Sequence, residues 1–141
     1  QAVLIEPEND WTHFLIGDHF RLQSALGGGK WEAEAESALE HFENAAKANP
    51  YRYETWLRKG YCLDWLGRNT EAEHAFEQAQ TLDPNGATTM AWVGWHWVQV
   101  GEYQKAVDQF LRSLNHLPAE KNPLAVTYLQ HARDRIKAGV R

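Results

Sequence analysis

Hydrophobic and small residues recur along this chain in a fixed order with a period of 34 residues. The segment 51–84 and the segment 85–118 show this order most clearly, because no insertion separates their equivalent positions. The matched pairs are Gly60 with Gly94, Gly67 with Gly101, Ala72 with Ala106, Phe76 with Phe110, Ala79 with Ser113, and Pro84 with Pro118. A repeat of this length predicts stacked supersecondary units, each made of two helices.

Each repeated residue has a physical role in such a pair of helices. Gly60 and its partner in the next unit lie where the two helices must approach closely, and Phe76 fills the space between them. Gly67 ends the first helix at a position that favours positive φ. The residues 70–73, TEAE, predict a capping box that starts the second helix, and Pro84 stops that helix.

The first unit departs from this order. Ala38, Phe42, Ala45 and Pro50 repeat its second half, which predicts a helix over about 31–48, but the glycines at 27–29 interrupt the first half. Placing Gly17 in the glycine position restores the match and predicts a first helix over about 11–26. The unit then contains a nine-residue insertion that lengthens this helix and adds the GGGK turn.

The chain after Pro118 predicts one further helix. Asn122 is a candidate N-cap, and Pro123 suits the first helical position. The apolar stripe of this helix is expected to consist of Leu124, Tyr128, Leu129, Ala132 and Ile136. We therefore predict a helix that caps the last hairpin.

The repeated order resembles the tetratricopeptide repeat, whose signature is matched by Trp56, Gly60, Gly67, Ala72, Phe76, Ala79 and Pro84. The resemblance implies an all-α, right-handed superhelical solenoid of three helical hairpins and a capping helix. The expected divisions are an extension at 1–10, units at 11–50, 51–84 and 85–118, and the cap at 119–141. The first helices of the units would line a concave groove.

This groove is the default binding site that the resemblance implies. Its expected lining is Phe14, Asp18, Arg21, Leu57, Arg58, Tyr61, Asp64, Trp65, Trp92, Trp95 and Gln99. These side chains suit apolar side chains of a protein or peptide, or the faces of sugar rings. Tyr61 and Trp95 stand where a carboxylate-binding groove would need lysine and asparagine, so we do not expect that specificity. The alternative is that some rings only pack against neighbouring helices.

We expect no catalytic, cofactor or metal site, and therefore no enzyme. His19, Cys62 and His96 share one repeat position, but successive units place them about 8–10 Å apart, too far for one zinc ion. They are expected to form a half-buried column. The remaining histidines are expected at surface or hinge positions, and they are His13, His41, His74, His116 and His131. The GGGK turn lacks the serine or threonine of a phosphate loop. The acidic residues Glu6, Glu8, Glu32, Glu34 and Glu36 are expected on a solvated face.

Charge, cysteine content and apolar run length exclude several kinds of partner and structural feature. The formal net charge of −5 provides no large basic face, so nucleic acid is not an expected partner. The single cysteine, Cys62, excludes an internal disulfide. No apolar run approaches the roughly 20 residues that span a bilayer. Because the first residue is Gln1, we expect a soluble piece of a longer protein.

Three stretches, FLIGDHFRLQS, YCLDWLGR and GWHWVQVG, resemble the tetratricopeptide tails of bacterial O-antigen ligase or polymerase-like membrane proteins. This resemblance implies an accessory domain tethered to the inner membrane through upstream sequence, with polysaccharide or the membrane portion of its own chain as partner. Two hypotheses therefore stand. One is a protein-interaction module that binds a peptide or partner subunit, and the other is this accessory domain. Within GWHWVQVG, Trp97 is expected in the core and Trp95 at the groove.

Overall fold

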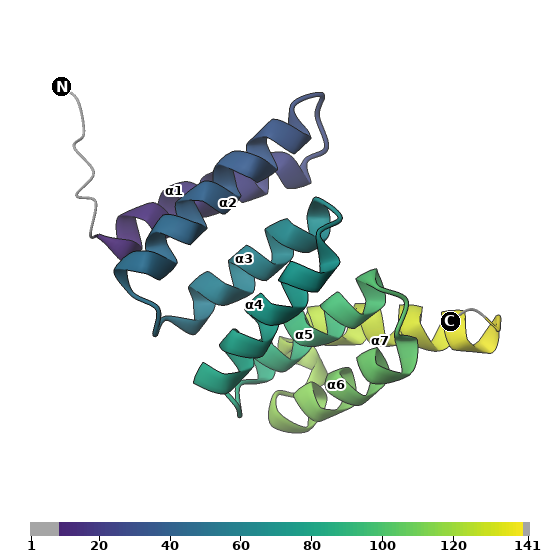
Figure 1. Ribbon diagram of the computed structural model, residues 1–141. Helices are drawn as coiled ribbons and strands as arrows, with labels where there is room; N and C mark the ends of the chain where they lie inside the picture. The colour runs from purple at the N-terminus through teal and green to yellow at the C-terminus, as the bar shows by residue number, and fades with distance from the viewer. Residues whose placement is uncertain (1–8, 140–141) are drawn as a thin grey trace. The chain divides into compact units, whose positions relative to one another are not determined.

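The computed structural model describes residues 9–139, and all regular structure within that range is helical. The helices are α1 (Asp10–Ala25), α2 (Trp31–Ala48), α3 (Tyr53–Trp65), α4 (Asn69–Leu82), α5 (Ala87–Gln99), α6 (Tyr103–His116), a 3-10 turn η1 (Ala119–Lys121), and α7 (Pro123–Lys137) (Figure 1). The two helices predicted for the first repeat, over about 11–26 and 31–48, are confirmed to within one residue as α1 and α2. Most of the predicted extension at 1–10, including Glu6 and Glu8, lies outside the described residues, as does Arg141 at the end of the predicted cap.

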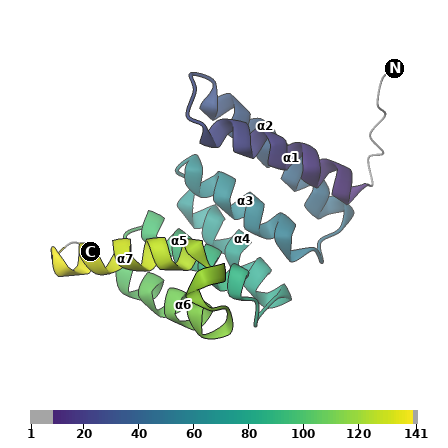
Figure 2. The same ribbon diagram turned by 180° about the vertical axis from the view of Figure 1, so that it is seen from behind.

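The described residues form two compact units, the first ending at Leu82 and the second beginning at Asp83. In the first unit α1 packs on α2, α2 packs on α3, and α3 packs on α4 (Figures 1 and 2). In the second unit α5 packs on α6, and α7 packs on both. The expected succession of three hairpins and a final helix is therefore present along the chain.

A glycine facing a phenylalanine holds each hairpin together. A Cβ atom added to the glycine would overlap the ring, so only glycine permits this approach of the two helices. The distances from that Cβ to the nearest ring carbon are 2.9 Å for Gly17 and Phe42, 2.7 Å for Gly60 and Phe76, and 2.6 Å for Gly94 and Phe110. Each of these rings is at most 2% exposed. The predicted roles of the glycines and phenylalanines are confirmed, including that of Gly17 in the irregular first hairpin.

The turn inside the second hairpin also follows the prediction. Gly67 has a φ of 82°, in the left-handed region that favours glycine. Its N–H donates to the carbonyl of Asp64 at 2.9 Å, and the N–H of Arg68 donates to the carbonyl of Leu63 at 2.7 Å. These bonds satisfy the last carbonyl groups of α3, as in a Schellman motif.

The predicted capping box at Thr70 is wrong. The helix α4 begins one residue earlier, at Asn69, and the carbonyl of Arg68 accepts its first hydrogen bond, from the N–H of Ala72 at 3.0 Å. Thr70 therefore lies inside the first turn. The tight turn at Gly67 leads directly into the helix, and Arg68 pairs with Glu71 at 2.8 Å across that turn.

The cap helix α7 begins at Pro123 as predicted, but the side chain of Asn122 does not cap it. Asn122 is 4% exposed and donates its amide protons to Ser113 Oγ at 2.9 Å and to the carbonyl of Leu117 at 3.2 Å. Its side chain thus ties the start of α7 to the end of α6.

The apolar stripe of α7 is shorter than predicted. Leu129 and Ala132 are buried. Ile136 is 40% exposed, because the core that α7 shares with α6 ends at Ala132. Ala125, absent from the expected stripe, is fully buried in that core. Trp97 packs against the same core, as expected.

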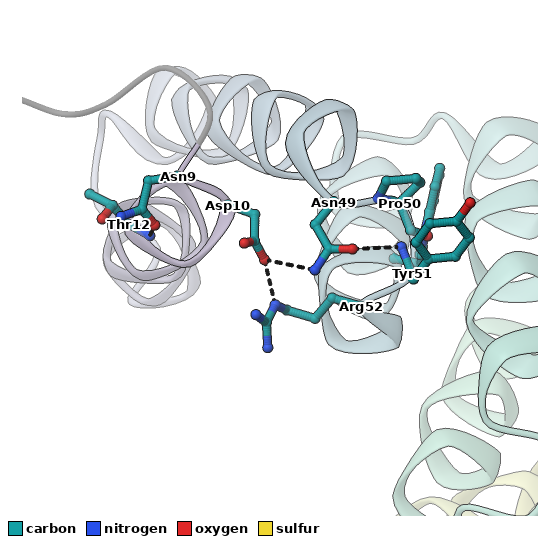
Figure 3. A network of polar contacts seen from close by, with 8 residues as sticks. Asn9, Asp10, Thr12, Asn49, Pro50, Tyr51 and Arg52 are labelled. Carbon is teal, nitrogen blue, oxygen red and sulfur yellow. Dashed lines mark hydrogen bonds and ion pairs between the residues drawn. The ribbon is translucent and has the colours of Figure 1, made fainter.

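Polar contacts fix the beginning of α1 to the turn between α2 and α3 (Figure 3). The carboxylate of Asp10 accepts from Arg52 Nε at 2.6 Å and from Asn49 Nδ2 at 3.5 Å (Figure 3). The Arg52 guanidinium also lies 4.9 Å from the centroid of the Trp11 ring. These contacts position α1, the helix that carries Asp18 and Arg21.

Candidate functional site

Charged and aromatic residues gather on α1 and α3 in the first unit. The set consists of Asp18 and Arg21 on α1, and Arg58, Tyr61 and Trp65 on α3, and we call it the charged–aromatic surface. Its spacings of three and four residues place these side chains on one side of each helix. Five of the eleven predicted groove residues are therefore brought together here.

Two guanidinium groups meet one carboxylate at the centre of this surface. Arg21 Nε lies 2.6 Å from Asp18 Oδ1, and Arg58 Nε lies 3.2 Å from the same oxygen. Burial, and then the nearby Arg21, lower the pKa of Arg58 below its ordinary value, while Asp18 opposes this change. An arginine stays protonated in proteins, so two positive charges face one negative charge. The trio of Asp18, Arg21 and Arg58 is a net positive patch, and the carboxylate of Glu54 also acts on Arg58 from outside the trio.

The aromatic part continues along α3. The Arg21 guanidinium lies 5.1 Å from the Tyr61 ring centroid, within range of a cation–π interaction. The Tyr61 and Trp65 rings stack at 6.1 Å with an interplanar angle of 17°. Trp65 is 36% exposed, so part of an apolar indole ring adjoins the positive patch through Tyr61.

A short hydrogen-bond chain fixes the Trp65 ring. Its Nε1–H donates to Ser24 Oγ at 3.0 Å, and the Ser24 hydroxyl donates to the carbonyl of Trp31 at 2.5 Å. The Trp31 and Trp65 rings meet edge to face at 5.9 Å, and together with Gly27 they line a pocket of about 390 Å³.

Neither Ser24 nor Trp31 is among the site residues that the repeat pattern predicts. The available signal was the insertion in the first unit, because Trp31 directly follows the GGGK turn and Ser24 lies close before it. The repeat template has no counterpart for an insertion, so counting positions from the repeated glycine could not identify these two residues.

Three predicted groove residues of the first unit are buried instead. Phe14 is 5% exposed and lies under the guanidinium of Arg58, 5.6 Å from it. Leu57 is 1% exposed and belongs to the core. Asp64 is 7% exposed, and its carboxylate accepts a hydrogen bond from Asn69 Nδ2 at 2.8 Å. These three side chains support the fold rather than offering a surface to a partner.

On α5, in the second unit, the three predicted groove residues differ in exposure. Trp95 is 7% exposed, while Trp92 is half-buried and Gln99 is exposed. The expectation that Trp95 is an accessible contact is therefore wrong. Buried residues cover nearly the whole circumference of α5, so a template that assigns a single packed face misplaces this ring.

The shared column of His19, Cys62 and His96 is not uniformly half-buried. His19 is exposed, whereas Cys62 and His96 are each 1% exposed. Burial raises the pKa of the Cys62 thiol to about 12, so it stays protonated near neutral pH and is a poor nucleophile or metal ligand. Within residues 9–139 no group of three or more metal-ligating side chains gathers.

His13 and His41 are not the surface or hinge residues that we expected. His13 is 9% exposed, and its Nδ1 lies 3.1 Å from Nδ1 of His41 across the contact of α1 with α2. Phe20 stacks on His41 at 5.9 Å. Only one of the two facing nitrogens can donate in this hydrogen bond, so the pair cannot keep it when both rings are doubly protonated.

Acidification is expected to destabilise the first unit through this pair. Burial, and then His13, lower the pKa of His41 below 6.5, while Glu40 opposes the change. The folded state then binds fewer protons than the unfolded state, so this stability is fully present above pH 6.5 and is lost as the pH falls through the lowered pKa. Urea unfolding near pH 7.5 and near pH 5 should show a larger loss in the wild type than in His41→Phe, which keeps a ring beside Phe20. Equal losses would contradict the assignment.

None of the helices in the described part of the chain combines the length and the apolar character that a transmembrane helix needs.

The family model of the tetratricopeptide repeat matches residues 21–87 and 66–124. Subunit 3 of the anaphase-promoting complex of Schizosaccharomyces pombe is 28% identical over 113 residues, which cover 80% of this chain but only 16% of that protein. The chain thus spans about a sixth of the length of this relative.

Solved structures agree with the family match at the level of the fold. The first tetratricopeptide domain of human RPAP3 has a TM-score of 0.79 at 15% identity, covering 94% of this chain and 96% of that domain. The first such domain of Spaghetti (RPAP3), bound to the HSP90 peptide SRMEEVD, has a TM-score of 0.75 at 14% identity, covering 96% and 99%. The predicted all-α fold class is confirmed. The chain belongs to the tetratricopeptide repeat family.

Proposed function

We propose that this chain is a non-catalytic module that binds a segment of a partner protein at the charged–aromatic surface. The observation that carries the proposal is the meeting of Arg21 and Arg58 on one carboxylate beside the partly exposed ring of Trp65. A positive patch next to a flat apolar ring suits a peptide that carries an acidic side chain close to an aromatic or aliphatic one.

The fold supports the general class of this proposal. A tetratricopeptide repeat fold suggests a protein–protein interaction module, and proteins with these repeats are generally non-catalytic scaffolds. The peptide held by the Spaghetti (RPAP3) domain is an example of such a ligand on a related fold. Fold alone does not fix the ligand, so the specificity rests on the side chains named above.

The hydrogen bonds behind Trp65 favour binding at this place. Because Ser24 holds the indole nitrogen, the ring keeps its orientation without a ligand, so the Trp65 side chain loses less conformational entropy when a partner binds.

Selection of a random peptide library on the immobilised chain tests this function. Enriched peptides should combine an acidic residue with a nearby aromatic or aliphatic residue, and their affinity should fall as salt is added, since the patch is charged. In Arg58→Gln, which removes one guanidinium, the dissociation constant should rise about tenfold or more. Failure to enrich any peptide class, or enrichment of peptides that bind Arg58→Gln equally well, would overturn the proposal.

The alternative of an accessory domain for an O-antigen ligase-like enzyme rests on the three stretches FLIGDHFRLQS, YCLDWLGR and GWHWVQVG alone. Neither the family match nor the relatives described above support it, and it stays a prediction. The complete reading frame tests it, because several apolar spans of about 20 residues upstream would be required.

A further inference from the structure

A stripe of large apolar side chains is exposed along α1 and at Leu26, the C-cap residue of this helix. It consists of Trp11, Leu15, Leu22 and Leu26, which are 44%, 51%, 54% and 81% exposed, and we call it the α1 stripe. Successive spacings of four, seven and four residues keep these side chains on one side of a helix. Large exposed apolar side chains that gather on one side of a helix mark a candidate interaction site.

The positions of the α1 stripe can be compared with the equivalent positions of α3 in the next hairpin. Gly17 and Gly60 are equivalent, since each faces the phenylalanine of its own hairpin. Counted from these glycines, Leu15 corresponds to Arg58 and Leu22 corresponds to Trp65.

Both of those α3 residues contact the preceding hairpin. Arg58 lies against Phe14 and Asp18, and Trp65 donates to Ser24 on α1. The α1 stripe therefore occupies the positions that this repeat uses for stacking one hairpin on another, and on α1 those positions are apolar and exposed.

The spacing of the stripe is symmetric along the helix. Reversing the helix about the midpoint between Asp18 and His19 exchanges Trp11 with Leu26, and Leu15 with Leu22. A second α1 laid antiparallel would therefore oppose an apolar side chain to an apolar side chain at all four levels. Antiparallel packing also opposes the two helix dipoles, whereas parallel packing would place each charged residue level with its own copy.

We propose that the α1 stripe is a homodimer interface at which the α1 helix of a second copy packs antiparallel. The pairing is isologous, with one patch serving both copies, as in most symmetric dimers. Asp18 flanks the centre of the stripe, and its carboxylate already accepts two guanidinium groups, so the pairing buries no uncompensated negative charge. The interface goes beyond the proposed peptide site and does not depend on it.

Sedimentation equilibrium of the wild-type chain over a range of concentrations tests the dimer. The chain should dimerise, and Leu15→Asp and Leu22→Asp should each raise the dissociation constant at least about 30-fold, the loss typical of a central interface residue. Leu111→Asp, at a leucine of α6 that is 44% exposed, is the matched control and should leave the dimer unchanged. A wild type that stays monomeric, or a dimer that survives both α1 substitutions, would overturn the proposal.

Cysteine pairs test the antiparallel arrangement. A mixture of Leu15→Cys and Leu22→Cys chains should form a disulfide between the two variants, because these positions lie opposite each other. Each variant alone should not crosslink, since like positions would be about 10 Å apart along the helix axis, beyond the reach of a disulfide. The native Cys62 is 1% exposed and does not interfere. Crosslinking within either single variant would contradict the antiparallel packing.

Discussion

Replacing Phe76 by alanine is expected to lower the free energy of unfolding of the first unit by about 3–5 kcal/mol. The ring is 2% exposed and fills the space between α3 and α4, where it faces the bare backbone of Gly60. Truncation leaves a cavity that neither helix can close, because the turn at Gly67 fixes their separation. Urea unfolding followed by circular dichroism measures the change.

The matched control for this substitution is Tyr51→Ala. It also removes an aromatic ring from the same unit, but Tyr51 is 80% exposed, so the expected change is within about 0.5 kcal/mol. If both variants lost the same free energy, the ring of Phe76 would not be the centre of this hairpin.

Replacing Gly60 by alanine is expected to destabilise the same unit by about 1–3 kcal/mol. In an ordinary helix this change stabilises by about 1 kcal/mol, because alanine loses less backbone entropy than glycine. Here the new Cβ would lie 2.7 Å from Cε2 of Phe76, and either the ring or the helix must move. The sign of the measured change thus separates steric overlap from helix propensity.

Gly28→Ala is the control for the glycine substitution, since no heavy atom beyond the adjoining residues lies within 4 Å of the added Cβ. Its expected effect is within about 0.5 kcal/mol. The double variant Gly60→Ala/Phe76→Leu should lose less than the sum of its two single changes, because the smaller side chain makes room for the methyl group. Strictly additive changes in the free energy of unfolding would mean that the residues at positions 60 and 76 do not interact.

The hairpins were predictable because their determinants are local in the repeat. Gly60 and Phe76 recur at a fixed spacing, and any side chain at that glycine would clash with the ring. Gly67 has positive φ for a similarly local reason. Even in the first hairpin, where an insertion displaces the pattern, the same spacing predicts the role of Gly17.

The site was only partly predictable, because exposure depends on packing around the whole helix. The template placed Leu57 and Trp95 on the groove side, but both are buried. It also missed Trp31, which the insertion brings against Trp65. The pair of His13 and His41 joins residues 28 positions apart, a contact that no local pattern encodes.

The charged–aromatic surface is the proposed binding site for a partner peptide. The most direct measurement compares the affinity of one library-selected peptide for the wild type, Trp65→Ala and Trp56→Ala. Trp56 is a matched control because it lies on the same helix in a separate pocket, beside Leu63 and Ala75, and donates to the carbonyl of Pro50 at 2.8 Å.

Circular dichroism first confirms that all three chains are folded. Isothermal titration calorimetry should then give a dissociation constant at least about 30-fold weaker for Trp65→Ala, and within about threefold of the wild type for Trp56→Ala. Equal affinity of the wild type and Trp65→Ala, or a larger loss in Trp56→Ala, would contradict this assignment of the binding surface.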